Sequence, residues 1–462
     1  MEGNHWLNWA VLVPVLFFLL AAKFMFHKLK IPKNLPPSPP ARPIVGHFHL
    51  LKQPVHQTLH ELAKKYGEIL FLRYGNRKVL VISSPSAVEE CFTKNDVIFA
   101  NRPRSLAGKH LNYNCTTMGS CNYGDHWRNL RRLTTIELFS TSRTASFSGI
   151  RTEEEILKET EALRGSSNLY DYFPVLRWVD YQGVEKKMLR LKKKMDSFLQ
   201  DLIEEHRRAR AETESSATLN LHKASNQKLD MTLIDVMLSL KETEPEFYTD
   251  QTIKGVILTI LTAGSQTSAA TLEWAMSLLL NHPEALQKAV AEIDVVVGID
   301  KLLSETDVQK LSFLQNVINE TFRLFPTAPL LLPHESSADC TVCGYDVARG
   351  TLLLVNTWSM NRNPKLWEDP EKFMPERFEG GEGEENKLLP FGAGRRACPG
   401  AGLAKRVISL TLGSLIQSFE WERVCKEEIN MEEGTGLTMP KAIPLEAFCK
   451  PRQAMVNLLS TL

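Results

Sequence analysis

The 462-residue sequence lacks features that would place it in several common functional classes. Its 55 Lys and Arg residues balance 54 Asp and Glu residues, and no DNA-binding motif is visible, so a nucleic-acid-binding protein is not expected. No GxGxxG fingerprint occurs, so a flavin or nicotinamide nucleotide must come from outside the chain. The length allows about three domains. However, no internal repeat is present and 43% of the residues are apolar, which favours one large helix-rich body.

The N-terminus has no basic residues before its apolar run, which argues against the alternative of a cleaved signal peptide. The run Trp6–Ala22 would rise roughly 26 Å as a helix, just enough to span a membrane. The lysines that follow are expected to stay on the cytosolic side. Prolines in 36–40 then predict a stiff hinge. We therefore expect an anchor in 1–30, a hinge in 31–45 and a cytosolic body in 46–462.

The eight cysteines form no recognisable disulfide or zinc framework. Cys340 and Cys343 have the spacing of a zinc-binding pair, but no second pair follows at a suitable distance. Because the body is expected to lie in the cytosol, we expect free thiols.

Cys398 is surrounded by glycine and arginine in the decapeptide Phe391–Gly400. A thiolate that binds an axial iron position must project from a tight turn whose amide groups point at the sulfur. Gly394 and Gly400 permit such an approach, and the planar guanidinium of Arg396 suits a haem propionate. Apolar residues between 403 and 415 predict a helix behind the sulfur, whose dipole favours a negative charge. A free buried cysteine beside a glycine-rich turn is the alternative.

The spacing Phe-x2-Gly-x-Arg-x-Cys-x-Gly resembles the haem-binding loop of the cytochromes P450. Glu320-x2-Arg323 and the later Arg377 also match this family, in which the three side chains form a structural charge cluster. On the residues alone, the first two could equally be an ordinary surface ion pair. The resemblance implies a mainly α fold with a small β portion and an N-terminal transmembrane helix. It also implies haem b with Cys398 as the axial iron ligand, in a loop that includes Phe391 and Gly392.

The apolar run 253–280 is interrupted by the small and polar residues of 263–268. Ala263 and Gly264 would leave room for a diatomic ligand, and the Thr267 hydroxyl could donate a hydrogen bond to it. A core helix with a packing notch is the alternative, but the position resembles the oxygen-activating helix of the family. There an acidic residue usually precedes the threonine, and here it is Gln266, which cannot shuttle protons as a carboxyl does. Proton delivery would then depend on Thr267, Ser268, neighbouring Ser265 and water, and we expect reduced coupling of electron use to product.

The resemblance assigns further residues to the haem and the substrate. Trp127 and Arg131, at the start of a helix, would pair with a propionate, although Trp-x3-Arg is common on helices. His334 would also reach a propionate, with a solvent-facing histidine as the alternative. The substrate candidates lie in an irregular stretch at 101–123, on the notched helix, after Arg323 and near the C-terminus: Leu111, Met118, Ala263, Thr327, Ala328, Leu330, Leu331, Leu437 and Thr438. Mostly apolar, they suit a hydrophobic, aromatic or polycyclic substrate.

One segment departs from the plant members that the sequence most resembles. They carry two core helices between the counterparts of Arg131 and of 172–180, whereas residues 143–170 hold only a short charged stretch, Arg151–Glu161. Several dozen residues are therefore missing. Their loss would expose apolar surface if those helices pack against the notched helix, at about 25 cal/mol per Å². An inactive product of splicing or of an incorrect gene model is an alternative that this gap raises.

The resemblance implies a plant microsomal monooxygenase of the endoplasmic reticulum membrane, similar to members that act on isoflavonoids, lignans and indolic compounds. It would insert one atom of O2 into a small hydrophobic, phenolic or indolic substrate, with electrons from NADPH through NADPH-cytochrome P450 reductase. Arg128, Arg132, Lys405 and Arg406 could form the docking face, although each is individually ordinary surface charge. A P450-fold isomerase or lyase that needs no reductase is a further alternative.

Overall fold

The computed structural model describes most of the chain. The described ranges are 14–15, 34–140, 159–160, 163, 169–173, 176, 183–217, 232–380 and 387–460, without the side chains of 136–140 and 214–217. Nearly all of the expected membrane anchor and most of 143–170 lie outside these ranges. Within them, no helix combines the length and apolar character that crossing a membrane requires.

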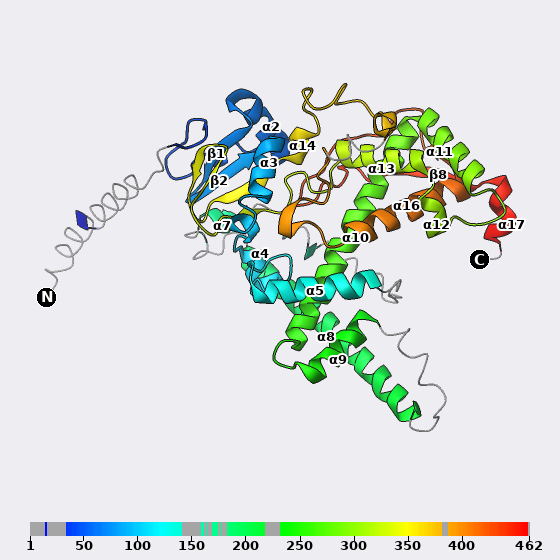
Figure 1. Cartoon of the computed structure of the whole chain (residues 1–462), viewed down its shortest axis with the longest axis horizontal. Coiled ribbons are helices and arrows are strands. Elements are labelled where there is room, and N and C mark those ends of the chain that lie inside the picture. The colour runs from blue at the N-terminus through cyan, green and yellow to red at the C-terminus, as the bar shows by residue number, and fades with distance from the viewer. Residues whose placement is uncertain are drawn as a thin grey trace, which may run out of the picture.

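Helices dominate the described chain, as the sequence predicts (Figure 1). The α-helices are α2 (Val55–Tyr66), α3 (Pro85–Phe92), α4 (Leu106–Leu111), α5 (Asp125–Ser140), α7 (Leu169–Tyr172), α8 (Val184–Ala217), α9 (Leu233–Thr243), α10 (Asp250–Asn281), α11 (Pro283–Val296), α12 (Glu305–Val308), α13 (Ser312–Leu324), α14 (Thr357–Met360), α16 (Ala401–Ser418) and α17 (Val456–Leu459). Short 3-10 turns are η1 (Phe48–Leu50), η2 (Ile98–Ala100), η6 (Pro375–Phe378), η7 (Gly394–Arg396) and η8 (Gln453–Met455). The predicted helices at 253–280 and 403–415 are found as parts of α10 and α16.

A four-stranded sheet has the strand order β1-β2-β6-β3. Its strands are β1 (Ile69–Tyr74), β2 (Arg77–Ile82), β3 (His334–Glu335) and β6 (Leu352–Val355). β2 and β6 are parallel and mostly buried, which explains their continuous apolar sequences. Two smaller antiparallel sheets pair β4 (Cys340–Val342) with β5 (Tyr345–Val347) and β7 (Phe419–Arg423) with β8 (Ala447–Pro451). The expected small β portion is therefore confirmed.

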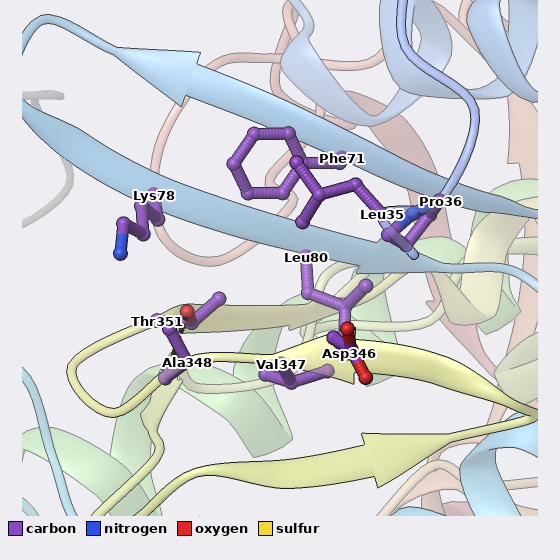
Figure 2. Close-up of a pocket in the computed structure, with 9 residues that line it drawn as sticks. All are labelled: Leu35, Pro36, Phe71, Lys78, Leu80, Asp346, Val347, Ala348 and Thr351. Carbon is purple, nitrogen blue, oxygen red and sulfur yellow. Dashed lines mark hydrogen bonds between the residues drawn. The ribbon is translucent and has the colours of Figure 1, made fainter. Parts of the chain in front are cut away.

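Part of the expected hinge packs against this sheet. Leu35 and Pro36 line one small crevice together with Phe71 of β1 and Leu80 of β2 (Figure 2). The Phe71 amide donates a hydrogen bond to the Pro37 carbonyl at 3.0 Å. These contacts hold residues 35–37 against β1 and β2.

α10 links the two largest apolar clusters of the described residues. It begins after Thr249, whose hydroxyl accepts a hydrogen bond from the Thr252 amide at 3.2 Å and so caps the helix. Its N-terminal half packs with α4, α8 and α9, and its C-terminal half packs with α11, α13 and α16. Between these halves, residues 263–265 are exposed. The predicted notch therefore interrupts a helix that is buried on either side of it.

The expectation of an uncovered apolar face is wrong for the N-terminal half of α10. Ile253, Val256 and Ile257 are at most 5% exposed. Side chains of α4, α5, α8 and α9 cover them in a single cluster, which explains why the shortened segment leaves no open face there. Leu189 on α8 is a large apolar side chain that does remain 47% exposed.

The stretch 101–123 is less irregular than expected, because it contains α4. The Ser105 hydroxyl accepts a hydrogen bond from the Gly108 amide at 2.9 Å and caps this helix. The next helix, α5, begins at Asp125, two residues before Trp127. α5 reaches the Cys398 loop, because its Arg131 donates a hydrogen bond to the Ala397 carbonyl.

Candidate active site

The loop around Cys398 is a closed backbone turn. The Cys398 amide donates to the Phe391 carbonyl at 2.8 Å, and the Ala397 amide donates to the Gly394 carbonyl at 3.0 Å. Gly394 has φ +66°, and a Cβ atom there would lie 2.5 Å from Asp96 Oδ1. Only glycine fits at this position, as the sequence predicts.

Gly400 differs from its expected role. Its φ of −87° suits any residue, and an added Cβ would make an ordinary contact of 3.8 Å with the Cys398 sulfur. It serves as the N-cap residue of α16, which begins directly behind the sulfur as predicted. Partial desolvation raises the pKa of the Cys398 thiol, while the Gly400 amide and the Arg131 charge act to lower it. Cys398 as a whole residue is exposed.

The expected helix behind the sulfur is exposed at its start. Leu403 and Val407 are 37% and 42% exposed, although the sequence pattern predicts that they are buried. Leu412, further along α16, is fully buried. The first turns of α16 therefore expose apolar side chains, and residues 263–265 of α10 are exposed as well.

Three arginines approach the Cys398 loop from different elements. Arg396, within the loop, donates from Nε to the Ala100 carbonyl at 2.7 Å and from Nη2 to the Cys121 carbonyl at 2.6 Å. Its guanidinium lies 4.6 Å from the ring centre of Trp127. Arg131 of α5 donates to the Ala397 carbonyl at 2.6 Å. The structure thus brings Arg396, Trp127 and Arg131, each predicted to serve a propionate, together beside the Cys398 loop.

Arg102 is the third arginine, and the sequence analysis missed it. It donates from Nη1 to the carbonyls of Leu332 and Pro333, both at 2.7 Å. A backbone bridge between Asn101 and Glu335 holds it beside the strand that carries His334. An arginine before a proline is no functional signal by itself, so only the long-range pairing of these segments reveals its place.

Within the described residues, no carboxylate pairs with Arg102, Arg131 or Arg396. Burial, with repulsion from neighbouring arginines, lowers the pKa of Arg102 to about 9 and the pKa of Arg396 to about 10. Moreover, Nε of Arg102 is buried without a hydrogen-bond partner. Buried charge without a counterion is costly, so this cluster is suited to an anion from outside the chain.

His334 lies beside the same cluster. It is 4% exposed, and its Nδ1 lies 2.7 Å from the Phe99 carbonyl, so the solvent-facing alternative is wrong. Burial, and next the charge of Arg102, lowers the pKa of His334 to about 3. The imidazole is therefore neutral at physiological pH.

The α10 notch lies at the centre of the helix. The Thr267 hydroxyl donates to the Ala263 carbonyl at 2.6 Å, and the Thr271 hydroxyl donates to the Thr267 carbonyl at 2.9 Å. Such bonds to the preceding turn compete with the backbone ladder and tend to bend a helix. The Thr271 hydroxyl also lies 3.0 Å from the hydroxyl of Thr327. The notch is thereby tied to the segment that follows Arg323.

The substrate candidates fall into two groups. Leu111 is fully buried among core side chains, Leu331 is 8% exposed, and Leu330 packs on the sheet cluster. Leu331 nevertheless approaches the Cys398 loop, because its Cδ1 would lie 3.8 Å from a Cβ on Gly392. The more open candidates are Met118, Ala263, Thr327, Ala328, Leu437 and Thr438.

The predicted cluster of Glu320, Arg323 and Arg377 is confirmed. Arg323 donates from Nε and Nη2 to the two Glu320 oxygens at 2.7 and 2.8 Å, and both side chains are fully buried. Arg377 Nε donates to Glu320 at 3.1 Å. The remaining Arg323 donors bond carbonyls of Asn361, Pro370 and Lys372. Because every partner is internal, the cluster fastens α13 to the following loop and takes no part in chemistry.

A model of the family described as cytochrome P450 matches residues 36–164 and 154–445 of the chain. The chain belongs to the cytochrome P450 family. It is 45% identical to an isoflavone 3'-hydroxylase of Medicago truncatula, covering 90% of this chain and 93% of that protein. It is 43% identical to a (+)-piperitol/(+)-sesamin synthase of Sesamum radiatum, covering 92% of each. The chain is thus a P450 of the plant biosynthetic type and a monooxygenase.

A solved structure of a zebra fish cytochrome P450 with abiraterone shows the same fold. It has a TM-score of 0.67 and 24% sequence identity, and covers 86% of this chain and 100% of that one. The mainly helical P450 fold with a small β portion is therefore established for the described residues.

Haem b is the cofactor of this family, used with O2 and electrons derived from NADPH. The site fits it, because a tight backbone turn presents Cys398 at the start of α16 and the arginines at that turn have no carboxylate partner among the described residues. Arg102, Arg131 and Arg396 would meet the two propionates, which would supply the counterions that the chain itself lacks. Trp127 and His334 lie against these arginines and would complete that end of the site.

The comparisons also locate the shortened segment. The two matches to the family model overlap at 154–164, inside the region where residues were expected to be missing. The alignment with the Medicago protein runs over 480 positions but takes in only 90% of this 462-residue chain. Several dozen of those positions therefore have no counterpart here.

Proposed function

We propose that this P450 hydroxylates a hydrophobic plant specialised metabolite, such as a phenolic, flavonoid or isoflavonoid, lignan or indolic compound. The proposal rests on one observation: Arg396 of the Cys398 loop, Arg131, which bonds that loop, and the buried Arg102 beside them have no carboxylate partner among the described residues. The Medicago and Sesamum relatives, at 45% and 43% identity, support the substrate class. Met118, Ala263, Thr327, Ala328 and Leu437 offer a mostly apolar lining with few hydroxyls, which favours such a substrate.

Each element of the site has a separate role. Haem b, when bound, supplies oxygen activation, which a cysteine thiolate ligand promotes by favouring O–O cleavage. The turn at Gly394 holds the Cys398 sulfur at the start of α16, and the helix dipole favours its negative charge. The arginines orient the cofactor by its propionates. Ala263 and Gly264 leave space beside the Thr267 hydroxyl, which can hold a proton donor close to the reacting oxygen.

The direct test is turnover in microsomes that contain a plant reductase and NADPH, with a panel of isoflavones, lignan precursors and indoles. We expect hydroxylated product that requires both NADPH and the reductase. Conversion without reductase would instead establish the isomerase or lyase alternative. Retained haem with no conversion in any arm would contradict the proposed substrate class.

Gln266 replaces the acidic residue expected before Thr267, so proton delivery must use hydroxyls of Thr267, Ser265 and Ser268 together with water. We expect Gln266→Asp to lower hydrogen peroxide release per NADPH, by up to about tenfold, because a carboxyl shuttles protons and an amide does not. The measurement is the peroxide-to-NADPH ratio in both proteins. Gln287→Asp, the same change at an exposed position of α11, is the matched control. Equal ratios in wild type and Gln266→Asp would show that the amide at position 266 does not limit proton delivery.

The reductase partner is expected on the side of α16 behind Cys398. Lys405 and Arg406 are exposed there, and Arg406 lies 3.9 Å from Glu305 on the surface. Changing both to glutamate should raise the reductase Michaelis constant about threefold or more at low salt, because charge complementarity mainly sets association. The matched control is charge reversal of exposed Lys64, which pairs with Glu61 in α2. An unchanged constant would remove the pair from the interface.

Residues 1–30 are proposed to anchor the protein in the endoplasmic reticulum membrane, with residues 46–462 in the cytosol. The apolar run Trp6–Ala22 and the lysines behind it support this orientation. Alkaline carbonate extraction of microsomes tests it: the full chain should remain with the membrane. Release of the full chain into the supernatant would contradict a spanning anchor.

A further inference from the structure

Glu433 is a buried carboxylate whose hydrogen-bond partners come from α2 and α14. Its side chain is 6% exposed. Oε2 accepts hydrogen bonds from His56 Nε2 at 2.6 Å and from Gln57 Nε2 at 2.8 Å. Oε1 accepts from Trp358 Nε1 at 2.7 Å, and Arg362 Nη2 lies 3.9 Å away. Two of these donors, His56 and Gln57, lie more than 370 positions away from Glu433 in the sequence.

These donors come from two helices that lie side by side. His56 and Gln57 belong to α2, and Trp358 belongs to α14, which contacts α2 (Figure 1). Desolvation raises the pKa of Glu433, but the hydrogen bonds from His56, Trp358 and Gln57 outweigh it, so the pKa is lowered. The carboxylate is charged, and charge-assisted bonds of this kind are the strong ones.

A short hairpin begins at Glu433. The Gly434 amide donates to the Pro440 carbonyl at 2.8 Å, and the Ala442 amide donates to the Glu432 carbonyl at 2.9 Å. The turn between its two arms contains Leu437, a large apolar residue that is 36% exposed. An exposed leucine on a short turn takes its position from whatever holds the arms.

The second arm is held at Met439, which is 1% exposed. Its amide donates to the Thr327 carbonyl at 2.9 Å, and its carbonyl accepts from Trp274 Nε1 of α10 at 2.9 Å. Thr327 is in turn joined to Thr271 of α10 through their hydroxyls. One arm of the hairpin is therefore fastened beside the α10 notch, and the other is fastened to α2 and α14 through Glu433.

We propose that Glu433 is a positioning residue for the substrate pocket. By binding α2 and α14, it fixes the 434–438 turn and thereby the place of Leu437 and Thr438, which limits how large ligands are held. The inference rests on the proposed function, because it takes this turn to line the pocket. Glu433 itself touches neither substrate nor cofactor.

Glu433→Gln is the sharpest change, because it keeps the shape and removes the charge. The amide offers one acceptor oxygen in place of two, and its NH2 group must face other donors. At least one buried donor from His56, Gln57 or Trp358 then loses its partner. The turn should loosen while the Cys398 loop stays unchanged.

The test compares two iron ligands by their absorption changes in the haem-loaded protein. Imidazole reports access to the iron alone, whereas 1-phenylimidazole also fills the pocket. We expect Glu433→Gln to raise the Kd of 1-phenylimidazole about tenfold, or about 1.4 kcal/mol, with little change for imidazole. Glu432→Gln, at the exposed neighbouring residue, is the matched control and should change neither value.

The outcomes separate the inference from the proposed function. Equal Kd ratios in wild type and Glu433→Gln, or an equal rise for both ligands, would overturn the positioning role. Failure of wild type to bind even imidazole would instead contradict the haem site. If Glu433→Gln yields no folded protein, Trp358→Phe removes one donor alone and should raise the 1-phenylimidazole Kd by a smaller factor.

Hydrogen exchange gives a second readout that needs no ligand. The amides of Gly434 and Ala442 are bonded across the hairpin, so they should exchange about tenfold faster in Glu433→Gln. Amides in α13, which does not contact Glu433, should be unchanged. Equal protection of the hairpin in both proteins would contradict the proposal.

Discussion

The two buried groups of arginines in this P450 differ in where their counterions come from. Arg323 and Arg377 share Glu320, and the other Arg323 donors bond backbone carbonyls. Arg102 and Arg396 bond carbonyls only, and no carboxylate among the described residues pairs with them. The first group has its counterion within the chain, whereas the second has none among the described residues, and we propose that it takes an anion from outside.

The presence or absence of an internal carboxylate partner distinguishes a structural arginine cluster from one suited to bind an anion, and no sequence motif is needed for this distinction. A buried charge persists in a fold only when it is paired, and the pairing shows what the site is for. The Glu320 group fastens α13 to the following loop. For the group around Cys398, we propose that the counterions are the propionates of haem, beside Trp127.

The largest effect is expected from a substitution in the cluster of Glu320, Arg323 and Arg377. Arg323→Met should destabilise the fold by about 3–5 kcal/mol, because it leaves the fully buried Glu320 carboxylate with Arg377 as its ion-pair partner and the Met374 amide as a donor. Thermal or denaturant unfolding of the microsomal protein measures it. Lys64→Met, in an exposed pair of the same i,i+3 spacing, should have no measurable effect. A loss as small as that of Lys64→Met would contradict the comparison.

For the arginines at the Cys398 loop, the expected effect on stability is smaller and of opposite sign. Arg102→Met removes a buried charge that has no internal counterion, so the haem-free protein should be as stable as wild type or slightly more stable. The same variant should lose haem roughly ten- to a hundredfold more readily, because one charge-assisted propionate contact is worth about 1.5–3 kcal/mol. Haem transfer to apomyoglobin, with unfolding of the haem-free protein alongside, measures both. Destabilisation without faster haem loss would show that Arg102 is merely structural.

The pH dependence of His334 provides a third, smaller test. Its pKa is lowered to about 3 from an ordinary value of 6.5, first by burial and then by Arg102. The unfolded state therefore binds the extra proton between those values, so stability is full above pH 6.5 and is lost as the pH falls. At pH 5.5 the loss should be about 1 kcal/mol in haem-free protein, and His334→Gln should abolish it.

Haem should weaken this pH effect, since propionates would offset the positive charge of Arg102 beside the imidazole. The comparison is unfolding at about pH 7.5 and about pH 5.5 for loaded and haem-free protein. An identical pH slope in both forms would contradict propionate binding next to His334.

Local patterns predicted much of this molecule, and long-range pairing accounts for what they missed. Apolar spacing and small residues located α10 and its notch, and the Cys398 loop was placed with its need for glycine at position 394. Arg102 was missed because only the bridge of its neighbour Asn101 to β3 brings it to the site. The prediction that Leu403 and Val407 are buried is wrong, because helical spacing identifies an apolar face but not whether other elements cover it.

The reduced carbon monoxide difference spectrum tests the central claim most directly. The full chain should show the band characteristic of thiolate-ligated haem, and Cys398→Ser should lose that band. This result would establish that the protein binds haem through Cys398 despite the shortened segment. It would also support haem propionates as the counterions of Arg102, Arg131 and Arg396. Absence of the thiolate band in the wild-type protein would contradict the account and would point to a splice or gene-model product that forms no cofactor site.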